Sequence, residues 1–130
     1  MYIKEQEPAM TTAPHIHLKL WLQRENTILL GLGRAQLLKK IGELGSLKKA
    51  AESLGMSYRA AWGRIKRTEQ AMGFALLEAA DTKREGCRLS PAGREAVEAF
   101  LAWYEDVHVY ALKRAKGLPF SVVRETPPAT

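Results

Sequence analysis

The side chains best placed to do chemistry in this 130-residue chain are cations between Ser46 and Arg67, which carry most of its net positive charge. Six lysine or arginine residues stand there against one carboxylate, Glu52, while the whole chain has a net charge of +6. Such a cluster can neutralise the phosphates of a polyanion, and a guanidinium fork can also address O6 and N7 of a guanine together. The six cations are Lys48, Lys49, Arg59, Arg64, Lys66 and Arg67.

Residues 45–73 predict the element that would present these cations: a helix, a tight glycine turn and a second helix. Ser46 and Ser57 are placed to cap the two helices, and Gly55 stands where the first must end in a left-handed residue. Each helix has an apolar stripe at helical spacing. The stripes are Leu47, Ala50, Ala51 and Leu54, then Ala61, Ile65, Thr68 and Met72. This is a helix-turn-helix, whose second helix, about 57–72, fits the major groove of DNA.

The first turn of the second helix holds the best candidates for reading base edges, because recognition helices use their N-terminal residues. We expect Arg59 to contact a base; a phosphate contact or a solvated charge is the alternative. Trp62 either touches DNA or packs between helices. Cations elsewhere would contact backbone phosphates. The full set of expected DNA contacts is Lys48, Lys49, Ser57, Tyr58, Arg59, Trp62, Lys66, Arg67, Lys83, Arg84 and Arg88.

Two small β-hairpins are predicted on either side of the helical region. Residues 17–23 alternate, with Leu18, Leu20 and Leu22 on one face, and residues 28–30 form a returning strand. The second hairpin has a strand over 74–80, a charged loop over 81–86 and a partner strand over 87–89. This second hairpin is a candidate wing, and its loop cations are either DNA contacts or simply exposed.

Two further helices complete the expected elements. The first, about 34–44, has a buried stripe of Leu37, Leu38, Ile41 and Leu44. The last begins after Ser90 with proline at its first position and can run to about Lys116. It carries more apolar side chains than one small domain can cover, so a second copy should cover the rest. The expected dimer interface is Val97, Phe100, Leu101, Trp103, Tyr104, Val107 and Tyr110. The alternative is a monomer that buries this helix on its own N-terminal hairpin.

The fold class that follows is mainly α with small β-hairpins: a winged helix-turn-helix with an N-terminal hairpin and a long C-terminal dimerisation helix. We expect a flexible tail over 1–14, the winged domain over 15–90, the dimerisation helix over 91–116 and a C-terminal tail over 117–130.

Short motifs in this region resemble the DNA-binding domain of the molybdate-responsive regulators, the ModE family. They are Gly33-Arg34, Leu37-Leu38, Gly45-Ser46-Leu47, Ala50-Ala51, Gly55-Met56-Ser57-Tyr58, Ala61-Trp62 and Leu89-Ser90-Pro91-Ala92-Gly93. The resemblance covers about residues 17–115 and implies a LysR-type winged helix-turn-helix that dimerises and binds double-stranded DNA in bacteria. Family members add C-terminal molybdate-binding domains, for which we expect no room in this chain, and their wing often has a longer glycine-rich insert. Molybdate is therefore a possible ligand by resemblance only.

Other classes of function find little support in the sequence. No apolar run approaches the ~18 residues of a membrane span, and the single cysteine, Cys87, allows no internal disulfide. His15 and His17 lack a third metal ligand, and no nucleophile–base pair is visible. We expect a cytoplasmic DNA-binding regulator that is not an enzyme and holds no cofactor. The alternatives are a winged-helix module that docks proteins, and a direct molybdate or oxyanion sensor.

Overall fold

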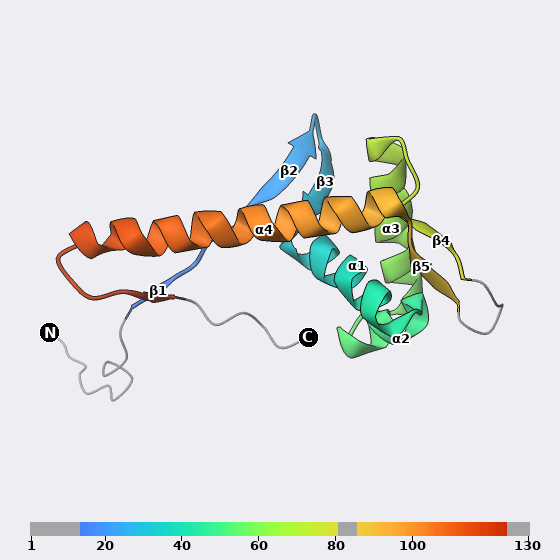
Figure 1. Ribbon diagram of the computed structural model, residues 1–130, viewed down its shortest axis with the longest axis horizontal. Coiled ribbons are helices and arrows are strands. Elements are labelled where there is room, and N and C mark those ends of the chain that lie inside the picture. Colours follow the sequence, from blue (N-terminus) through green and yellow to red (C-terminus); the bar gives the residue numbers. More distant parts are fainter. Residues whose placement is uncertain (1–13, 81–85, 125–130) are drawn as a thin grey trace, which may run out of the picture. The chain divides into compact units, whose positions relative to one another are not determined.

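The computed structural model describes residues 14–80 and 86–124 of the chain (Figure 1). The helices in these ranges are α1 (Leu32–Leu44), α2 (Leu47–Ser53), α3 (Tyr58–Met72), α4 (Pro91–Arg114) and the 3-10 helix η3 (Ala115–Gly117). The strands there are β1 (His15–Ile16), β2 (Trp21–Arg24), β3 (Thr27–Gly31), β4 (Leu77–Ala79), β5 (Cys87–Leu89) and β6 (Val123–Arg124). The fold is a mainly helical winged helix-turn-helix with small strand pairs and a long C-terminal helix, as the sequence predicts.

These elements form two compact units. The larger unit, Lys19–Tyr104, contains β2 to β5, α1 to α3 and the first part of α4. The smaller unit contains the described residues 14–18 and 105–124.

The core of the larger unit is built from the apolar stripes of its helices, closed by strands β3 and β5. The predicted stripes are buried almost throughout, including Thr68, whereas Leu54 and Met72 are half-buried. The prediction was wrong for Leu44, the last residue of α1, which is 42% exposed, whereas Ile41 three residues earlier is fully buried. The buried apolar side chains are Leu30, Ala35, Leu37, Leu38, Ile41, Leu47, Ala50, Ala51, Ala61, Ile65, Leu76, Leu89, Val97, Phe100 and Tyr104.

Short-range signals set the ends of the helices. The Ser46 hydroxyl accepts a hydrogen bond from the Lys49 amide at 3.1 Å, and the Ser57 hydroxyl accepts one from the Ala60 amide at 3.1 Å. Gly55 adopts the left-handed conformation, with φ +71°, in the turn between α2 and α3. The predicted caps and turn are therefore confirmed, with α3 beginning at Tyr58.

The N-terminal hairpin differs from its prediction in extent and in the exposure of Leu22. Strands β2 and β3 are antiparallel, but β2 starts at Trp21, and the register shifts between Leu22 and Gln23. The alternation predicted for 17–23 holds at Leu18 and Leu20, which are half-buried, and fails at Leu22, which is 45% exposed. The turn is made by Glu25, the one non-glycine residue with positive φ in the described chain.

The second hairpin pairs β4 with β5, and β4 is shorter than the strand predicted for 74–80. The amides of Leu76 and Leu77 donate to the Glu69 carboxylate, at 2.7 and 3.3 Å. These bonds hold the segment after α3 against Glu69, and β4 therefore begins only at Leu77. The predicted partner strand at Cys87–Leu89 is confirmed.

Helix α4 starts as the sequence predicts, with the Ser90 hydroxyl accepting from the Gly93 amide at 2.9 Å. Gly93 is required there, because a Cβ at this position would lie 2.3 Å from the Leu76 carbonyl oxygen. The expectation that this helix exposes Phe100 and Tyr104 was wrong. Both are buried in the core of their own chain, as is Val97.

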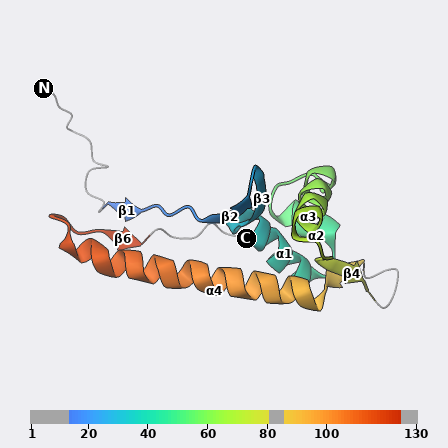
Figure 2. The ribbon, with the colours of Figure 1, turned by 90° about the horizontal axis from the view of Figure 1, so that it is seen from above.

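The smaller unit contains the second part of α4, then η3, and a parallel pair of very short strands. Strand β1 pairs with β6, with His15 opposite Val123 and Ile16 opposite Arg124 (Figure 2). The sequence did not predict this pair, since two-residue strands carry no readable alternation and β6 falls in the predicted tail. His108 of α4 is buried.

Candidate nucleic-acid interface

Helix α3 has two opposite faces of different character. Its inner face contributes Ala61, Ile65 and Thr68 to the core. Two aromatic side chains lie on the outer face: Tyr58 is 54% exposed and Trp62 is 48% exposed. The candidate DNA contacts Arg59, Lys66 and Arg67 are also exposed, as is Ser57 at the cap. The structure therefore brings the predicted contacts of this helix together on one accessible surface.

Trp62, for which packing between helices was the alternative, is about half exposed. The Lys66 ammonium lies over its indole ring, 5.4 Å from the ring centroid, one helical turn along α3. The same ammonium is 3.2 Å from Oε1 of Glu69, whose side chain is only 13% exposed. Lys66 is thus held between an aromatic face and a carboxylate, with its cationic head on the outer surface.

Glu69 was not predicted as part of the site, yet it connects α3 to the wing. One of its oxygens pairs with Lys66, and the other accepts the amides of Leu76 and Leu77. The i, i+3 spacing from Lys66 was the only signal in the sequence, and it indicates an ordinary surface ion pair. The bonds to the turn after α3 could not be read from spacing.

Arginine side chains fill the middle of α3. An added Cβ on Gly63 would lie 3.3 Å from Nη1 of Arg67, so the glycine leaves room for this guanidinium. Arg34, at the start of α1, faces the same region. Its partial burial, and next the charges of Arg67 and Arg64, lower its pKa below the ordinary arginine value. Positive charge is thus concentrated where α1 meets α3.

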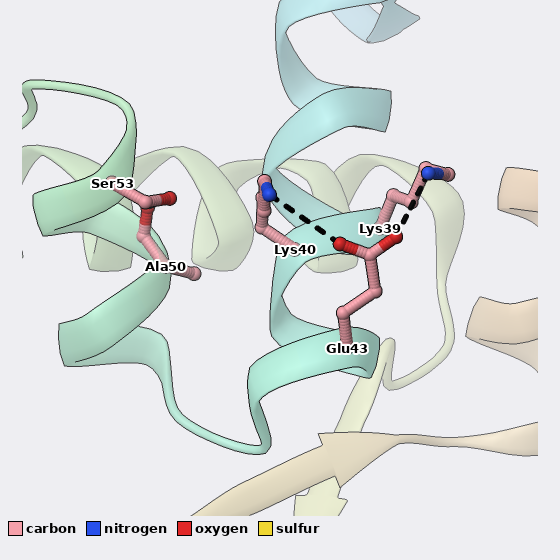
Figure 3. Close-up of polar contacts among 5 residues, drawn as sticks. All are labelled: Lys39, Lys40, Glu43, Ala50 and Ser53. Atoms are coloured by element: carbon pink, nitrogen blue, oxygen red, sulfur yellow. Dashed lines mark hydrogen bonds and ion pairs between the residues drawn. The ribbon is translucent and has the colours of Figure 1, made fainter. Parts of the chain in front are cut away.

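The first helix of the motif, α2, adds Lys48 and Lys49, both exposed. They lie in the first turn of α2, after the Ser46 cap and Leu47, at the positive end of the helix dipole. Neighbouring α1 is different, because its lysines have an acidic partner. Glu43 lies 2.8 Å from the Lys39 ammonium and 3.5 Å from that of Lys40 (Figure 3). The hydrogen bond from Lys39 is the main cause that lowers the pKa of Glu43.

In the wing, Arg88 of β5 is exposed and lies 3.7 Å from the carboxylate of Glu78 across the strand pair. Lys83 and Arg84 fall in 81–85, outside the described residues. The base of the wing is attached to the helices: the Cys87 amide donates to the Gly45 carbonyl at 3.3 Å. An added Cβ on Gly86 would lie 3.0 Å from that same carbonyl oxygen.

On α4, the seven residues predicted for a dimer interface divide into three groups. Val97, Phe100 and Tyr104 are buried in the chain's own core, so they are not available for a dimer interface. Leu101 and Val107 are half-buried. Trp103 and Tyr110 are exposed, by 39% and 61%.

Other kinds of site receive no support from the part of the chain that the structure describes. In residues 14–80 and 86–124, no three His, Cys, Asp or Glu side chains cluster as they would around a metal ion. Helices long and apolar enough to span a membrane are likewise absent from these ranges.

Comparison with known proteins points to the same elements. Residues 32–94 match the family described as bacterial regulatory helix-turn-helix protein, lysR family. The molybdenum-pterin-binding protein MopB of Rhodobacter capsulatus is 33% identical over 73 residues, which are 55% of this chain. The chain spans 27% of the length of that protein.

Solved structures share the fold. The crystal structure of the CbnR DBD–DNA complex aligns with a TM-score of 0.53 and 21% identity, over 64% of this chain and 95% of that one. The BenM DBD in complex with benA site 1 DNA aligns with a TM-score of 0.54 and 21% identity, over 68% of this chain and 99% of that one. The family match begins with α1 and ends in the first turn of α4, so it covers the same helix-turn-helix and wing that the structure describes.

Proposed function

We propose that this chain is a sequence-specific DNA-binding transcriptional regulator that places α3 in the major groove. The observation that carries the proposal is the division of α3 into a buried inner face and an exposed outer face with Arg59, Trp62 and Lys66. A helix so presented has the dimensions that the major groove accepts. The match of residues 32–94 to a family of bacterial regulators supports the same function.

The side chains divide into readers of bases and contacts to phosphates. Arg59, in the first turn of α3, is exposed and addresses a guanine edge, with Ser57, Tyr58 and Trp62 beside it. Cations farther along α3, on α2 and in the wing neutralise phosphates and release counterions. These phosphate contacts are Lys48, Lys49, Lys66, Arg67, Lys83, Arg84 and Arg88.

The protein acts as a homodimer through α4. Trp103 and Tyr110 are seven residues apart and therefore lie on one side of the helix, with half-buried Val107 between them. Such an apolar stripe is typical of a helix that packs against its symmetry mate. Two recognition helices would then enter major grooves roughly 34 Å apart on a near-palindromic site in the cytoplasm.

Fluorescence anisotropy with duplexes selected from genomic fragments tests this function. We expect the selected duplexes to bind more tightly than random ones, with affinity that falls steeply as salt rises. Absence of binding to every duplex at low salt would overturn the proposal and favour the winged-helix protein-docking module.

A second candidate is direct sensing of molybdate. Its support is the name of one relative, the molybdenum-pterin-binding protein MopB, which this chain matches over about a quarter of that protein's length. Titration calorimetry with sodium molybdate tests it on the intact chain. Heat that saturates with molybdate but not with sulfate would support sensing, and a flat trace would exclude it.

A further inference from the structure

The N-terminal hairpin, β2 with β3, precedes the matched segment 32–94 and lies beside α3 within the larger unit (Figure 1). One arginine of the hairpin and one that directly follows it in α1 point at α3. They are Arg24, at the end of β2, and Arg34, in the first turn of α1 just after β3. Neither is among the proposed DNA contacts.

Arg24 contacts the end of the recognition helix. Its Nη1 donates a hydrogen bond of 2.8 Å to the carbonyl oxygen of Ala71, 47 residues later in the chain. Ala71 lies in the last turn of α3, where carbonyl groups have no partner inside the helix. A cation at this end is also favoured by the helix dipole. Arg24 thus joins the tip of the hairpin to the C-terminal end of α3.

Arg34 contacts the inner face of the same helix. Its Nη1 donates to the Thr68 hydroxyl at 3.2 Å and also to the carbonyl oxygen of Ile28 in β3. Thr68 is 1% exposed, so its hydroxyl faces away from any DNA that lies on the outer face. One guanidinium therefore links β3, α1 and α3 at a buried point.

These contacts together restrict both the rotation and the tilt of α3. A bond at Thr68 limits rotation of the helix about its axis, and a bond at Ala71 limits movement of its end. Rotation of α3 would carry Arg59 away from the base edge that it contacts, and hydrogen bonds to bases tolerate little misplacement.

We propose that the N-terminal hairpin is a positioning element for the recognition helix, and that Arg24, Arg34 and Thr68 set sequence discrimination without touching DNA. This inference rests on the proposed function of α3. It predicts that changes on the buried side of the helix alter the preference for cognate over random duplexes. It also predicts that the number of phosphate contacts stays the same.

Thr68→Val gives the sharpest test, because valine keeps the branched shape and removes only the hydroxyl acceptor. Thr68→Ser is the matched control, since it keeps the hydroxyl and loses a methyl group. Anisotropy titrations of a selected and a random duplex, over a salt series, are made on the intact chain. We expect Thr68→Val to lower the cognate-to-random affinity ratio about 3- to 10-fold. The salt slope should stay unchanged, and Thr68→Ser should retain most of the ratio.

Arg24→Gln tests the hydrogen bond from Arg24 to the Ala71 carbonyl. Arg24 is exposed, so this change endangers folding less than a change at Thr68 does. Arg114→Gln, at the exposed end of α4, is a control with the same loss of charge. We expect Arg24→Gln to reduce the cognate-to-random ratio at an unchanged salt slope, Arg24→Lys to restore part of it, and Arg114→Gln to leave it intact. A parallel fall on both duplexes with a shallower salt slope would make Arg24 a phosphate contact and overturn its positioning role.

Failure of this inference can be told apart from failure of the proposed function. If the unaltered protein discriminates between duplexes and both Thr68→Val and Arg24→Gln discriminate equally well, the hairpin does not position α3. If the unaltered protein binds no duplex, the proposed function fails first. Circular dichroism melts accompany each variant, and if Thr68→Val does not fold, Arg24→Gln decides the outcome.

Discussion

Arg59 and Lys66 share the outer face of α3 but differ in their surroundings. Arg59 is exposed in the first turn, whereas Lys66 is held by the Trp62 ring and the Glu69 carboxylate. A side chain held by its own protein presents a fixed charge, which suits a phosphate better than a choice among base edges. The two positions should therefore respond differently to truncation.

Arg59→Ala should remove about 1–3 kcal/mol of discrimination at one base pair and leave binding to random duplexes nearly intact. Lys66→Ala should weaken all duplexes alike and reduce the salt slope by about 1. Anisotropy titrations of cognate, single-mismatch and random duplexes check both variants. Equal losses on all duplexes for both variants would contradict the assigned roles.

Glu43 allows a pH prediction on α1. Its pKa lies below the ordinary carboxyl value, first because of the hydrogen bond from Lys39. A lowered folded-state pKa stabilises the fold above the ordinary value, and that contribution is lost as pH falls through the lowered value. Carboxyl chemical shifts in an NMR titration should show this low pKa, and Lys39→Gln should move it upward. If the pKa of Glu43 does not move in Lys39→Gln, the hydrogen bond from Lys39 is not what lowers it.

At the scale of elements, the junction between the wing and α4 depends on one missing side chain. The Gly93 backbone lies against the Leu76 carbonyl, where an added Cβ would be only 2.3 Å from the oxygen. Gly93→Ala should therefore destabilise the fold by about 1–3 kcal/mol, because the backbone has to move apart. Urea unfolding monitored by circular dichroism measures the loss.

Gly33→Ala is the matched control for Gly93→Ala, since nothing lies within 4 Å of an added Cβ there. Gly33 is helical in α1, so alanine should be neutral or stabilising by up to about 1 kcal/mol. Similar midpoints for the two variants would show that the close approach at Gly93 carries no strain.

The sequence predicts best those elements that depend on local interactions. Ser46, Ser57 and Gly55 act within one helical turn of their own positions, so the caps and the glycine turn could be read directly. Residues whose environment comes from distant segments could not be placed. Phe100 and Tyr104 have the helical spacing that an exposed apolar stripe would also have. Only their packing against the rest of the chain buries them.

In the candidate site, too, local features could be predicted from the sequence and contacts between distant segments could not. Exposure of Arg59 and Lys66 follows from helical periodicity, which places them opposite the buried stripe. Tyr58 lies three residues before Ala61, on the side of the stripe, so its exposure could not be read from spacing. The contacts of Glu69 with Leu76 and of Arg24 with Ala71 join different elements, and no spacing in the sequence encodes them.

At the scale of the whole molecule, the proposed dimer should depend on Tyr110. Tyr110→Glu places a charge in the apolar stripe of α4 and should shift the protein from dimer to monomer in light scattering. Affinity for a duplex with two half-sites should then fall at least about 10-fold, while affinity for a single half-site changes little. Lys113→Glu, an exposed change on the same helix, serves as the control. A Tyr110→Glu variant that stays dimeric would exclude this interface.

The Glu69 carboxylate binds Lys66 with one oxygen and the amides of Leu76 and Leu77 with the other, and this has a practical consequence for engineering. Residues that fasten α3 to the rest of the fold, Thr68 and Glu69, are distinct from those on its outer face at 59 and 62. The outer positions should therefore tolerate grafting from another DNA-binding regulator as a set, with the fastening residues left in place. Chimeras made in this way would keep the scaffold and exchange only the operator that it recognises.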